Sequence, residues 1–398
     1  MRYLHELELK GRRVLMRVDF NCPLTESGRV ADDNRMVQAL PSVKHVLEQG
    51  GRLVLCSHLG RPKGERRPEF SLAPVAAHLS HLLGRDVPLA PDCVGPEVEE
   101  MARKVEPGGL LLLENLRFHK GETANDPEFA KGLAALGEVY VNDAFAVSHR
   151  AHASVAGVPP LMEECGAGFL LEKELDYFHR VMGSPERPMA AILGGAKVSS
   201  KLGVIRSLLD RADKIVIGGA MANTFLKAQG MPVGRSLVEE ELLDTARSIM
   251  DEARERGVII YLPVDGVVST STDPQGRVRI CPIQEVADDE MILDIGQATI
   301  SLFKEAIHDA RTVVWNGPMG LFEKVPFSTG TISLARAVAG CPGLTVVGGG
   351  DTGLAIQMAG EAPQISYIST GGGAFLALLE GQELPGVRAL DECGGGRP

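Results

Sequence analysis

The segment LTVVGGGDTGLAIQM, residues 344–358, decides the fold, because it predicts a short apolar strand, a glycine-rich turn and an apolar helix in succession. Ten short apolar runs along the chain end in comparable polar or glycine-rich clusters. Repeated strand-then-helix units predict parallel sheets, and open parallel sheets bind ligands at the carboxyl ends of their strands. The residues at these strand ends should therefore indicate the ligands.

The clusters change character halfway along the chain. Those of the first half contain arginine, histidine and asparagine, as in SHLGR at 57–61 and ENLR at 114–117. Those of the second half contain glycine and lysine, as in GGAK at 194–197. Guanidinium groups suit a small polyanion, and glycine-rich turns with a lysine suit the phosphates of a nucleotide. The sequence therefore predicts two ligand-binding domains.

The length of 398 residues also favours two domains. Residues 169–182 have apolar side chains at helical spacing, and a Gly/Pro/Ser loop follows to residue 188. We interpret this segment as the connector, which gives an N-terminal domain at 1–168, a hinge at 169–188 and a second domain from 189. One more helix of a single large sheet is the alternative. The glycine-rich tail, 391–398, is expected to be frayed.

Composition limits the possible partners and the compartment. The net charge is −11, and no basic stripe indicates a nucleic-acid partner. No apolar stretch approaches the ~18 residues that span a bilayer, and the N-terminus lacks a signal-peptide core, so we expect a cytoplasmic protein without a membrane partner. The seven cysteines are odd in number and form no CxxC pair, so we expect reduced thiols, with neither a disulfide framework nor a zinc site.

Five arginines of the first half lie on or near different predicted strand ends: Arg17, Arg35, Arg61, Arg117 and Arg150. His58 and His149 accompany two of them. Converging guanidinium groups predict a substrate with more than one anionic group, although any single arginine could form a surface ion pair. Asp19 and Asn21 could hydrogen-bond a substrate hydroxyl or simply form a turn.

The sequence GGAKVSSK at 194–201 does not fit the Walker motif. It offers glycines for close backbone approach, and its lysines Lys197 and Lys201 would share one face if a helix begins there. Such lysines would act as point charges on phosphates. A plain strand-to-helix turn with solvated lysines is the alternative.

The GGGDTG run at 348–353 matches G-x-G-x-x-G, but the acidic residue that NAD-binding sites carry ~20 positions later is absent. A glycine-rich turn at a helix N-terminus suits phosphate in general. Asp351 inside the turn is a candidate Mg²⁺ ligand, and a second glycine run, 371–373, could form another anion-binding turn. Either run alone could be an ordinary loop.

No GxSxG, HExxH or kinase catalytic-loop motif is present, and no general base is evident. If the nucleophile were already ionised, such as a carboxylate, phosphoryl transfer would need only positioning and charge neutralisation.

Taken in order, these motifs closely resemble those of the phosphoglycerate kinases. The resemblance is carried by RVDFNCPL at 17–24, SHLGRPKG at 57–64, ENLRF at 114–118, DAF at 143–145, HRAHAS at 149–154, GGAKV at 194–198, VWNGPMG at 314–320, GGGDT at 348–352 and STGGGA at 369–374. It covers nearly the whole chain. Departures are small, such as Tyr367 and Phe375 around the last motif, and none falls on a ligand residue.

The resemblance implies an α/β fold: two doubly wound parallel-sheet (Rossmann-like) domains joined by a helix, the second ending at residue 374, with the C-terminal segment, 375–398, returning to the N-domain. It implies a monomeric enzyme that transfers a phosphoryl group reversibly between 1,3-bisphosphoglycerate and Mg-ADP, giving 3-phosphoglycerate and ATP. Mg²⁺ would enter with the nucleotide.

The resemblance also assigns residues to the sites. The phosphoglycerate would be held by Asp19, Asn21, Arg35, His58, Arg61, Arg117 and Arg150. The nucleotide would be held by Lys197, Lys201, Gly219, Gly296, Glu323, Gly349, Gly350, Asp351 and Thr352, with Asp351 on Mg²⁺. The transferring group would be neutralised by Arg35, Lys197 and the backbone around Gly350 and Gly373.

Two other functional classes remain open at this point. A nicotinamide-dependent dehydrogenase would rest on the single G-x-G-x-x-G run. A non-catalytic nucleotide-binding or scaffold protein would keep the fold without turnover, although the matched lysines and arginines disfavour it.

Overall fold

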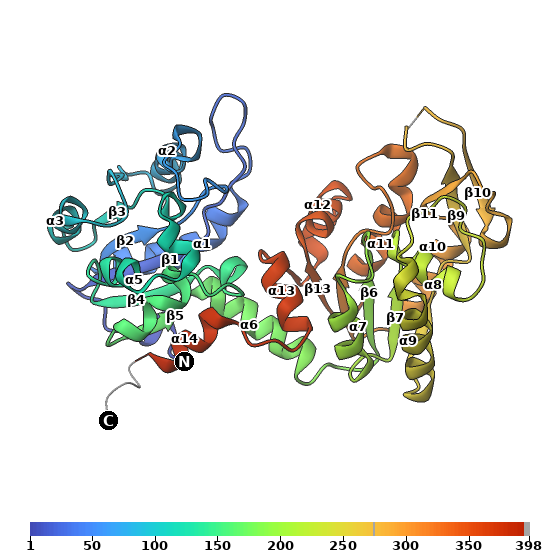
Figure 1. The fold of residues 1–398 in the computed structure, drawn as a ribbon. Coiled ribbons are helices and arrows are strands. Elements are labelled where there is room, and N and C mark those ends of the chain that lie inside the picture. Colours follow the sequence, from blue (N-terminus) through green and yellow to red (C-terminus); the bar gives the residue numbers. More distant parts are fainter. Residues whose placement is uncertain (274, 394–398) are drawn as a thin grey trace. The chain divides into compact units, whose positions relative to one another are not determined.

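The computed structural model describes residues 1–273 and 275–393. Contacts within the chain divide it into two units (Figure 1). Unit 1 comprises residues 1–176 together with the segment from Glu383, and unit 2 comprises Tyr177–Gln382. The domain boundaries expected from the sequence, at 168, 188 and 374, stay predictions.

Unit 1 contains a five-stranded parallel sheet in the order β3-β2-β1-β4-β5. Its strands are β1 (Arg13–Val18), β2 (Arg52–Cys56), β3 (Leu110–Leu112), β4 (Val139–Asp143) and β5 (Cys165–Ala167). Its helices include α1 (Asn34–Glu48), α2 (Ala73–Leu83), α3 (Pro96–Lys104), α4 (Lys120–Ala124) and α5 (Pro127–Ala134). The strands are almost continuously buried, as expected where helices cover both faces of a parallel sheet.

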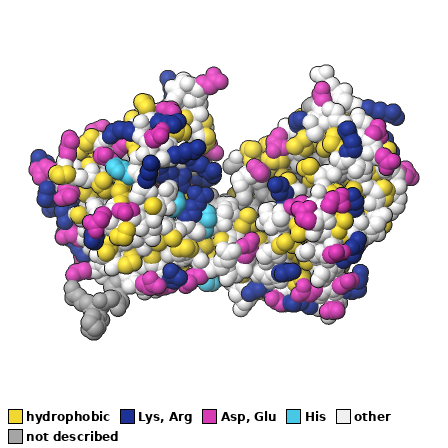
Figure 2. All heavy atoms as spheres, in the orientation of Figure 1, with side chains coloured by type: hydrophobic (Ala, Val, Ile, Leu, Met, Phe, Trp, Pro, Cys, Tyr) yellow, Lys and Arg dark blue, Asp and Glu magenta, His cyan; other side chains and the backbone are white. Residues whose placement is uncertain are grey.

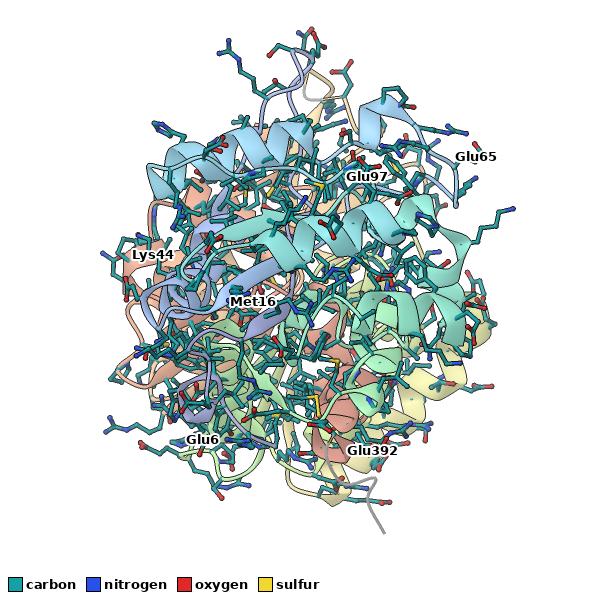
Figure 3. All side chains as sticks on the ribbon, turned by 90° about the vertical axis from the view of Figure 1, so that its left-hand side faces the viewer. Glu6, Met16, Lys44, Glu65, Glu97 and Glu392 are labelled. Atoms are coloured by element: carbon teal, nitrogen blue, oxygen red, sulfur yellow. A yellow bond between two sulfur atoms is a disulfide. The ribbon has the colours of Figure 1, made fainter. Side chains whose placement is uncertain are left out.

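The core of unit 1 forms between the sheet and its helices. Met16, in the central strand, is fully buried and lies near the middle of the view in Figure 3, whereas the exposed Glu65 lies at its edge. Local signals fix the helix ends. Asp126 accepts a hydrogen bond from the Phe129 N–H before α5, which begins with a proline.

Strand β5 was not predicted, because the short run CGA lacks β-branched and aromatic residues.

Unit 2 contains a six-stranded parallel sheet in the order β14-β13-β12-β6-β7-β8. Its strands are β6 (Met189–Leu193), β7 (Lys214–Ile217), β8 (Ile259–Tyr261), β12 (Thr312–Asn316), β13 (Leu344–Gly348) and β14 (Tyr367–Ile368). The helices are α7 (Leu202–Leu209), α8 (Met221–Ala228), α9 (Leu243–Glu255), α10 (Gln297–Ile307), α11 (Thr329–Ala339), α12 (Gly350–Met358) and α13 (Gly372–Leu379). Trp315 of β12 is fully buried in the core of this unit.

A second, antiparallel sheet of unit 2 was not predicted. It consists of β9 (Asp265–Ser269), β10 (Val278–Pro282) and β11 (Met291–Ile295), in the order β10-β9-β11. Asp265 follows the apolar run at 258–264 and so looks like the end of a parallel strand in the sequence, but it begins β9. Its carboxylate accepts hydrogen bonds from the N–H groups of Ala298 and Thr299 and so caps α10.

Helix α6 (Phe169–Met182) connects the units and has the bounds that its apolar spacing predicts. At the other end of the chain, α14 (Pro385–Glu392) returns to unit 1, as expected, where the Gly386 N–H donates to the Ser148 carbonyl. The expected fraying from residue 391 is wrong at its start, since α14 continues to Glu392; residues 394–398 lie outside the described residues.

The expectation that every cysteine is a reduced thiol is also wrong. Cys165 of β5 and Cys393 after α14 form a disulfide, with their Cα atoms 6.0 Å apart. The partners are 228 residues apart in the sequence, so spacing gives no sign of the pair. The link fastens the returning C-terminal segment covalently to the sheet of unit 1.

Candidate substrate and nucleotide sites

The loops that follow β1, β2 and β3 are joined by side chains at their carboxyl ends. The Asn21 Oδ1 accepts a hydrogen bond from the Gly60 N–H at 2.8 Å, and Arg117 donates to the Gly60 carbonyl at 2.8 Å. Asp19 accepts from the Asn21 N–H at 3.2 Å, so the turn expected as an alternative is present. These bonds hold three strand ends at one edge of the sheet.

Arg35 enters this edge from the second residue of α1. Its guanidinium forms an ion pair with the Asp19 carboxylate, which is almost completely buried. The His58 Nδ1 lies 3.7 Å from the Asp19 carboxylate and 3.0 Å from the Arg17 guanidinium. Arg17 is wholly buried and donates to the Ser154 hydroxyl, so it links His58 to the segment that follows β4.

A cavity of about 540 Å³ opens beside these groups. Its lining contains Arg61, Lys63, Gly64, Arg117, Lys120, Thr123 and Arg150. Three of the predicted arginines are therefore brought together, whereas Asp19, Asn21, Arg35 and His58 belong to the adjoining network. Figure 2 shows Lys and Arg side chains gathered with histidines on one face of unit 1. Five cationic side chains around one small cavity suit a phosphate-sized anion.

The pKa values of the titratable groups around the cavity are shifted in the direction that a concentration of positive charge produces. Burial, then Arg17, Arg117 and Arg35, hold the pKa of His58 well below its usual value. Burial and the charges of Arg117, Arg17 and Arg150 lower the pKa of His152 to about 4. Arg117 itself has a pKa lowered to about 10, by burial and by its arginine neighbours. Such repulsion between cations is relieved when an anion binds.

In unit 2, the loops after β6, β7 and β12 pack backbone against backbone. A Cβ atom on Gly194 would come within 2.2 Å of the Pro318 carbonyl oxygen, and one on Gly219 within 2.6 Å of the Gly195 nitrogen. Gly219 also has a φ of +67°, which favours glycine. The glycines that the sequence singles out are therefore required for close packing of three strand ends.

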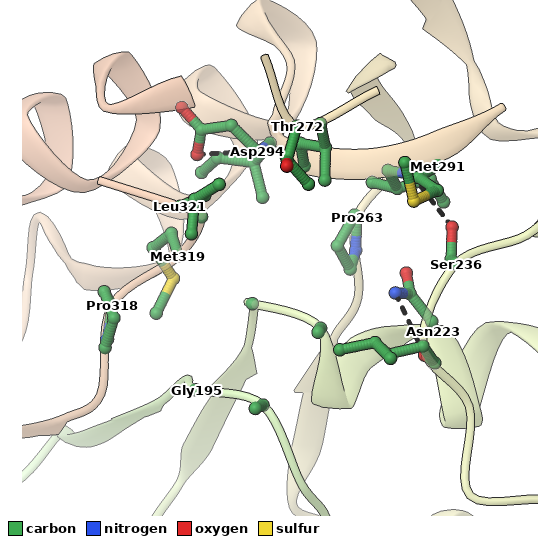
Figure 4. Close-up of a pocket in the computed structure, with 18 of the residues that line it drawn as sticks. Gly195, Asn223, Ser236, Pro263, Thr272, Met291, Asp294, Pro318, Met319 and Leu321 are labelled. Carbon is green, nitrogen blue, oxygen red and sulfur yellow. Dashed lines mark hydrogen bonds between the residues drawn. The ribbon is translucent and has the colours of Figure 1, made fainter. Parts of the chain in front are cut away.

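An apolar cavity of about 430 Å³ lies beside these loops (Figure 4). Its apolar lining includes Leu237, Pro263, Met291, Pro318 and Leu321. The Ser236 hydroxyl, which accepts from the Ile292 N–H, and the amide of Asn223 supply polar groups. The cavity has the size and apolar lining that a purine base requires. Of the predicted nucleotide residues, Gly219, Glu323 and Asp351 line it.

A smaller, polar cavity of about 250 Å³ lies among the glycine-rich turns. Gly349, Gly350, Asp351, Thr352 and Lys201 all line it. The Thr352 hydroxyl accepts a hydrogen bond from the Gly317 N–H at 2.8 Å and ties the turn after β13 to the loop after β12. Asp351 lines both cavities, so it lies between the apolar site and the glycine-rich turns.

Other predicted nucleotide residues are placed differently. Helix α7 begins at Leu202, so Lys197 and Lys201 lie in the preceding turn and not on one helical face, which corrects that expectation. Lys201 is buried and lines the polar cavity, and burial lowers its pKa to about 8. Lys197 is exposed and, with Gly296 and Gly373, lines neither cavity.

The Asp351 carboxylate fits a magnesium ion carried by a nucleotide. It lies in the first turn of α12, is exposed, and makes no hydrogen bond or ion pair within the described residues. A single free carboxylate beside a phosphate site is the usual protein ligand of such an ion, which keeps phosphate oxygens and waters as its other ligands.

The sequence was compared with known families, and residues 4–382 match the model of the family described as "Phosphoglycerate kinase". The chain belongs to the phosphoglycerate kinase family. The phosphoglycerate kinase of Desulfotalea psychrophila is 56% identical over 391 residues, 98% of this chain and 100% of that protein. That of Geobacter metallireducens is 54% identical over 395 residues, 99% of each chain.

Solved structures agree with the assignment. The structure of phosphoglycerate kinase from Coxiella burnetii has a TM-score of 0.89 at 42% identity and covers 98% of each chain. That of Phosphoglycerate Kinase from Pyrococcus horikoshii OT3 has a TM-score of 0.86 at 32% identity and covers 99% of each chain. The predicted family and fold class are therefore confirmed.

Two residues that depart from the phosphoglycerate kinase pattern have local partners. Tyr367 stacks on Tyr177, with ring centroids 4.3 Å apart and planes 5° from parallel. The ring of Phe375 packs under the turn after β13, where a Cβ on Gly348 would come within 2.0 Å of it.

Sequence reasoning missed several residues that line these cavities. Lys63 and Lys120 line the cationic cavity, and Lys63 lay inside the quoted SHLGRPKG motif, so the signal was present. The buried Asp294 accepts hydrogen bonds from the N–H groups of Gly330 and Ile295 beside the apolar cavity. Burial raises its pKa to about 7. No sequence motif marks Asp294, because its place beside the cavity depends on strand β11, which was not predicted.

We expect phosphoglycerate to raise the pKa of His152. Without ligand, burial and three arginines lower it to about 4, and an anion among those arginines would offset the repulsion. NMR titration of the His152 ring with and without 3-phosphoglycerate should show an upward shift. His78 of α2, which pairs with Asp33 at the N-cap of α1, is the control, and its pKa should be unchanged. An unshifted His152 at saturating ligand would contradict this electrostatic account.

Proposed function

We infer that this chain is a phosphoglycerate kinase enzyme. It transfers a phosphoryl group reversibly from 1,3-bisphosphoglycerate to ADP, giving 3-phosphoglycerate and ATP, a step of glycolysis. The family match over residues 4–382 carries this inference, together with a cationic cavity in unit 1 and paired nucleotide-sized cavities in unit 2. An apolar cavity adjoining a glycine-rich polar one suits a nucleotide, because a base and a polyphosphate need opposite environments.

In unit 1, the phosphate of the phosphoglycerate binds in the cationic cavity, through Arg61, Arg117 and Arg150. Their guanidinium forks match phosphate oxygens in pairs. The hydroxyl and carboxyl end lies against the Asp19, Asn21, Arg35 and His58 network. This assignment is supported by the lining of the cavity and by the hydrogen bonds that join the network to it.

In unit 2, the base of the nucleotide binds in the apolar cavity, which Gly219 and Glu323 line; Gly296 follows Ile295 of that lining. The phosphates bind across Gly349, Gly350 and Thr352, with Lys201 and Lys197 as cations. Asp351 would hold the Mg²⁺ that enters with the nucleotide. When bound, Mg²⁺ neutralises charge on the phosphate oxygens.

The reaction needs no general base, because the acceptor is a carboxylate that is already ionised. Arg35, Lys197 and the backbone N–H groups near Gly350 and Gly373 neutralise the transferring group. Such fixed donors stabilise charge where it develops in the transition state. This accounts for a site rich in cations and helix N-termini.

A coupled assay of ATP formation from 1,3-bisphosphoglycerate and Mg-ADP tests the function. We expect turnover that depends on both substrates and on Mg²⁺. Binding of NAD without Mg-ADP binding would favour a dehydrogenase, and Mg-ADP binding without turnover would favour a scaffold protein. Either outcome would overturn the proposal.

We further propose a monomeric cytoplasmic enzyme. Among the described residues, no helix is long and apolar enough to cross a membrane. The disulfide is uncommon in reducing compartments, so it is the observation that argues against this location. Light scattering on the purified protein tests whether it is a monomer, and fractionation of cells tests whether it is cytoplasmic.

We expect catalysis to require closure of the two units around both ligands. Direct transfer needs the carboxylate on unit 1 to reach the nucleotide on unit 2 and to be shielded from water. The region 169–188, which contains α6, provides the hinge. Both ligands together favour the closed state through their differential contacts. Small-angle scattering should therefore give a smaller radius of gyration with both ligands than with either alone; equal radii in all four ligation states would contradict closure.

A further inference from the structure

Three potential metal ligands of different chemistry meet in unit 1, outside the cavities described above. Asp92 and Cys93 lie in the loop before α3, and His119 precedes α4. One ligand atom from each, a carboxylate oxygen, a thiol sulfur and an imidazole nitrogen, lies within 4.8 Å of the other two. None of the three lines the cationic cavity.

The loop geometry fixes this cluster in place. Ala90, two residues before Asp92, donates its N–H to the Leu112 carbonyl of β3, and the Glu114 N–H donates to the Asp92 carbonyl. The His119 Nε2 lies 2.6 Å from the Asp92 Oδ1. The ring of His119 also packs against Phe129, at 5.2 Å between centroids. Backbone pairing and ring packing therefore hold all three side chains before any ion binds.

The donor set selects the kind of ion. Thiolate and imidazole are ligands of zinc and similar transition metals, whereas Mg²⁺ and Ca²⁺ prefer oxygen. Zinc bonds of about 2.0–2.3 Å in a tetrahedron place ligand atoms roughly 3.3–3.8 Å apart. The three atoms are close enough to reach that spacing by small side-chain rotations.

Access and charge also fit a divalent cation. Cys93 is fully buried, whereas the side chains of Asp92 and His119 are 36% and 33% exposed, so the cluster opens to solvent on one side. The Cys93 thiol loses its proton to solvent as the metal–sulfur bond forms. The resulting thiolate and the Asp92 carboxylate balance the charge of the ion. Arg66, whose charge also acts on Asp92, opposes binding.

We propose that Asp92, Cys93 and His119 form a binding site for a zinc-type divalent cation, with water as the fourth ligand. The ion would join the loop before α3 to the start of α4. Because His119 lies between Arg117 and Lys120, the site is adjacent in the chain to the lining of the cationic cavity. It is separate from the Mg²⁺ proposed on Asp351 in unit 2 and does not depend on it.

Cobalt, a spectroscopic substitute for zinc, provides the test on the full, metal-stripped chain. We expect one equivalent of Co²⁺ to give a sulfur-to-metal charge-transfer band, which Zn²⁺ abolishes by competition and excess Mg²⁺ leaves unchanged. Cys93→Ala should remove the band. His119→Gln, at a partly exposed position, should weaken affinity on the order of 10²-fold or more, since losing even an outer-shell partner costs 10–100-fold.

Two control variants make the test specific. Cys341→Ala removes a partly exposed free thiol outside the proposed site. His78→Gln removes a histidine that, like His119, pairs with an aspartate but has no cysteine as a third ligand. Both should bind Co²⁺ as the parent chain does. Circular dichroism and thermal unfolding verify that each variant is folded. No band with the parent chain, a band that survives in Cys93→Ala, or unchanged affinity in His119→Gln would overturn the proposal.

Discussion

Replacing Arg35 by alanine should lower kcat on the order of 10³-fold, the effect of losing a donor that meets charge in the transition state. Arg35 extends from α1 to the buried Asp19 carboxylate, and its own side chain is 37% exposed. It therefore retains surface for a ligand while it is held at one end. Steady-state kinetics in the direction of ATP formation measures the loss.

The ion pair offers a second explanation, in which Arg35 only positions Asp19. Arg35→Lys separates the two, because a lysine can keep the charge opposite Asp19 but lacks the planar fork that meets several oxygens. We expect lysine to remain nearly as inactive as alanine. Recovery of kcat in Arg35→Lys would assign Arg35 a positioning role, and near-normal kcat in Arg35→Ala would remove it from catalysis. Arg103→Ala, which loses an exposed ion pair on α3, is the control for folding and expression.

The sequence predicted the strand ends of the parallel sheets well, because each combines a buried apolar run with a polar turn. Helix α6 has the expected bounds, and β13 and α12 lie within the segment 344–358 that predicted a strand and a helix. The antiparallel sheet was missed for a physical reason. Its strand β10 is mostly exposed or half-buried, so no continuous apolar run marks it. Asp265 shows a second difficulty, because a carboxylate that caps a helix cannot be told from a strand-end ligand in the sequence.

The candidate site residues could be predicted only where a residue of suitable chemistry also stands at the end of a predicted parallel strand. Arg61, Arg117 and Arg150 come from separate strand ends, and the parallel topology brings them to one cavity. Lys197 carries the same charge as Lys201, yet only Lys201 is buried in the polar cavity. Which of two lysines four residues apart enters a cavity depends on where α7 begins, and the turn sequence does not specify that residue.

Replacing Asp351 by asparagine should lower kcat/KM for Mg-ADP on the order of 10²-fold, since even an outer-shell change at a metal site costs 10–100-fold in metal affinity. The half-saturating Mg²⁺ concentration should rise with it. Calorimetry should show that 3-phosphoglycerate binding is unchanged, because the cationic cavity lies wholly in unit 1. The substitution removes one negative charge and keeps the size of the side chain.

Local structure makes this result interpretable. The turn after β13 is held by the Thr352 hydroxyl and by the Asn316 amide, which donates to the Gly348 carbonyl at 2.7 Å. Neither bond involves Asp351, so the turn should survive the substitution. Asp244→Asn, at the matching second position of α9 and 95% exposed, is the control and should leave Mg²⁺ dependence unchanged. Equal loss of affinity for both substrates in Asp351→Asn would show a collapsed turn, and an unchanged Mg²⁺ requirement would exclude Asp351 as the ligand.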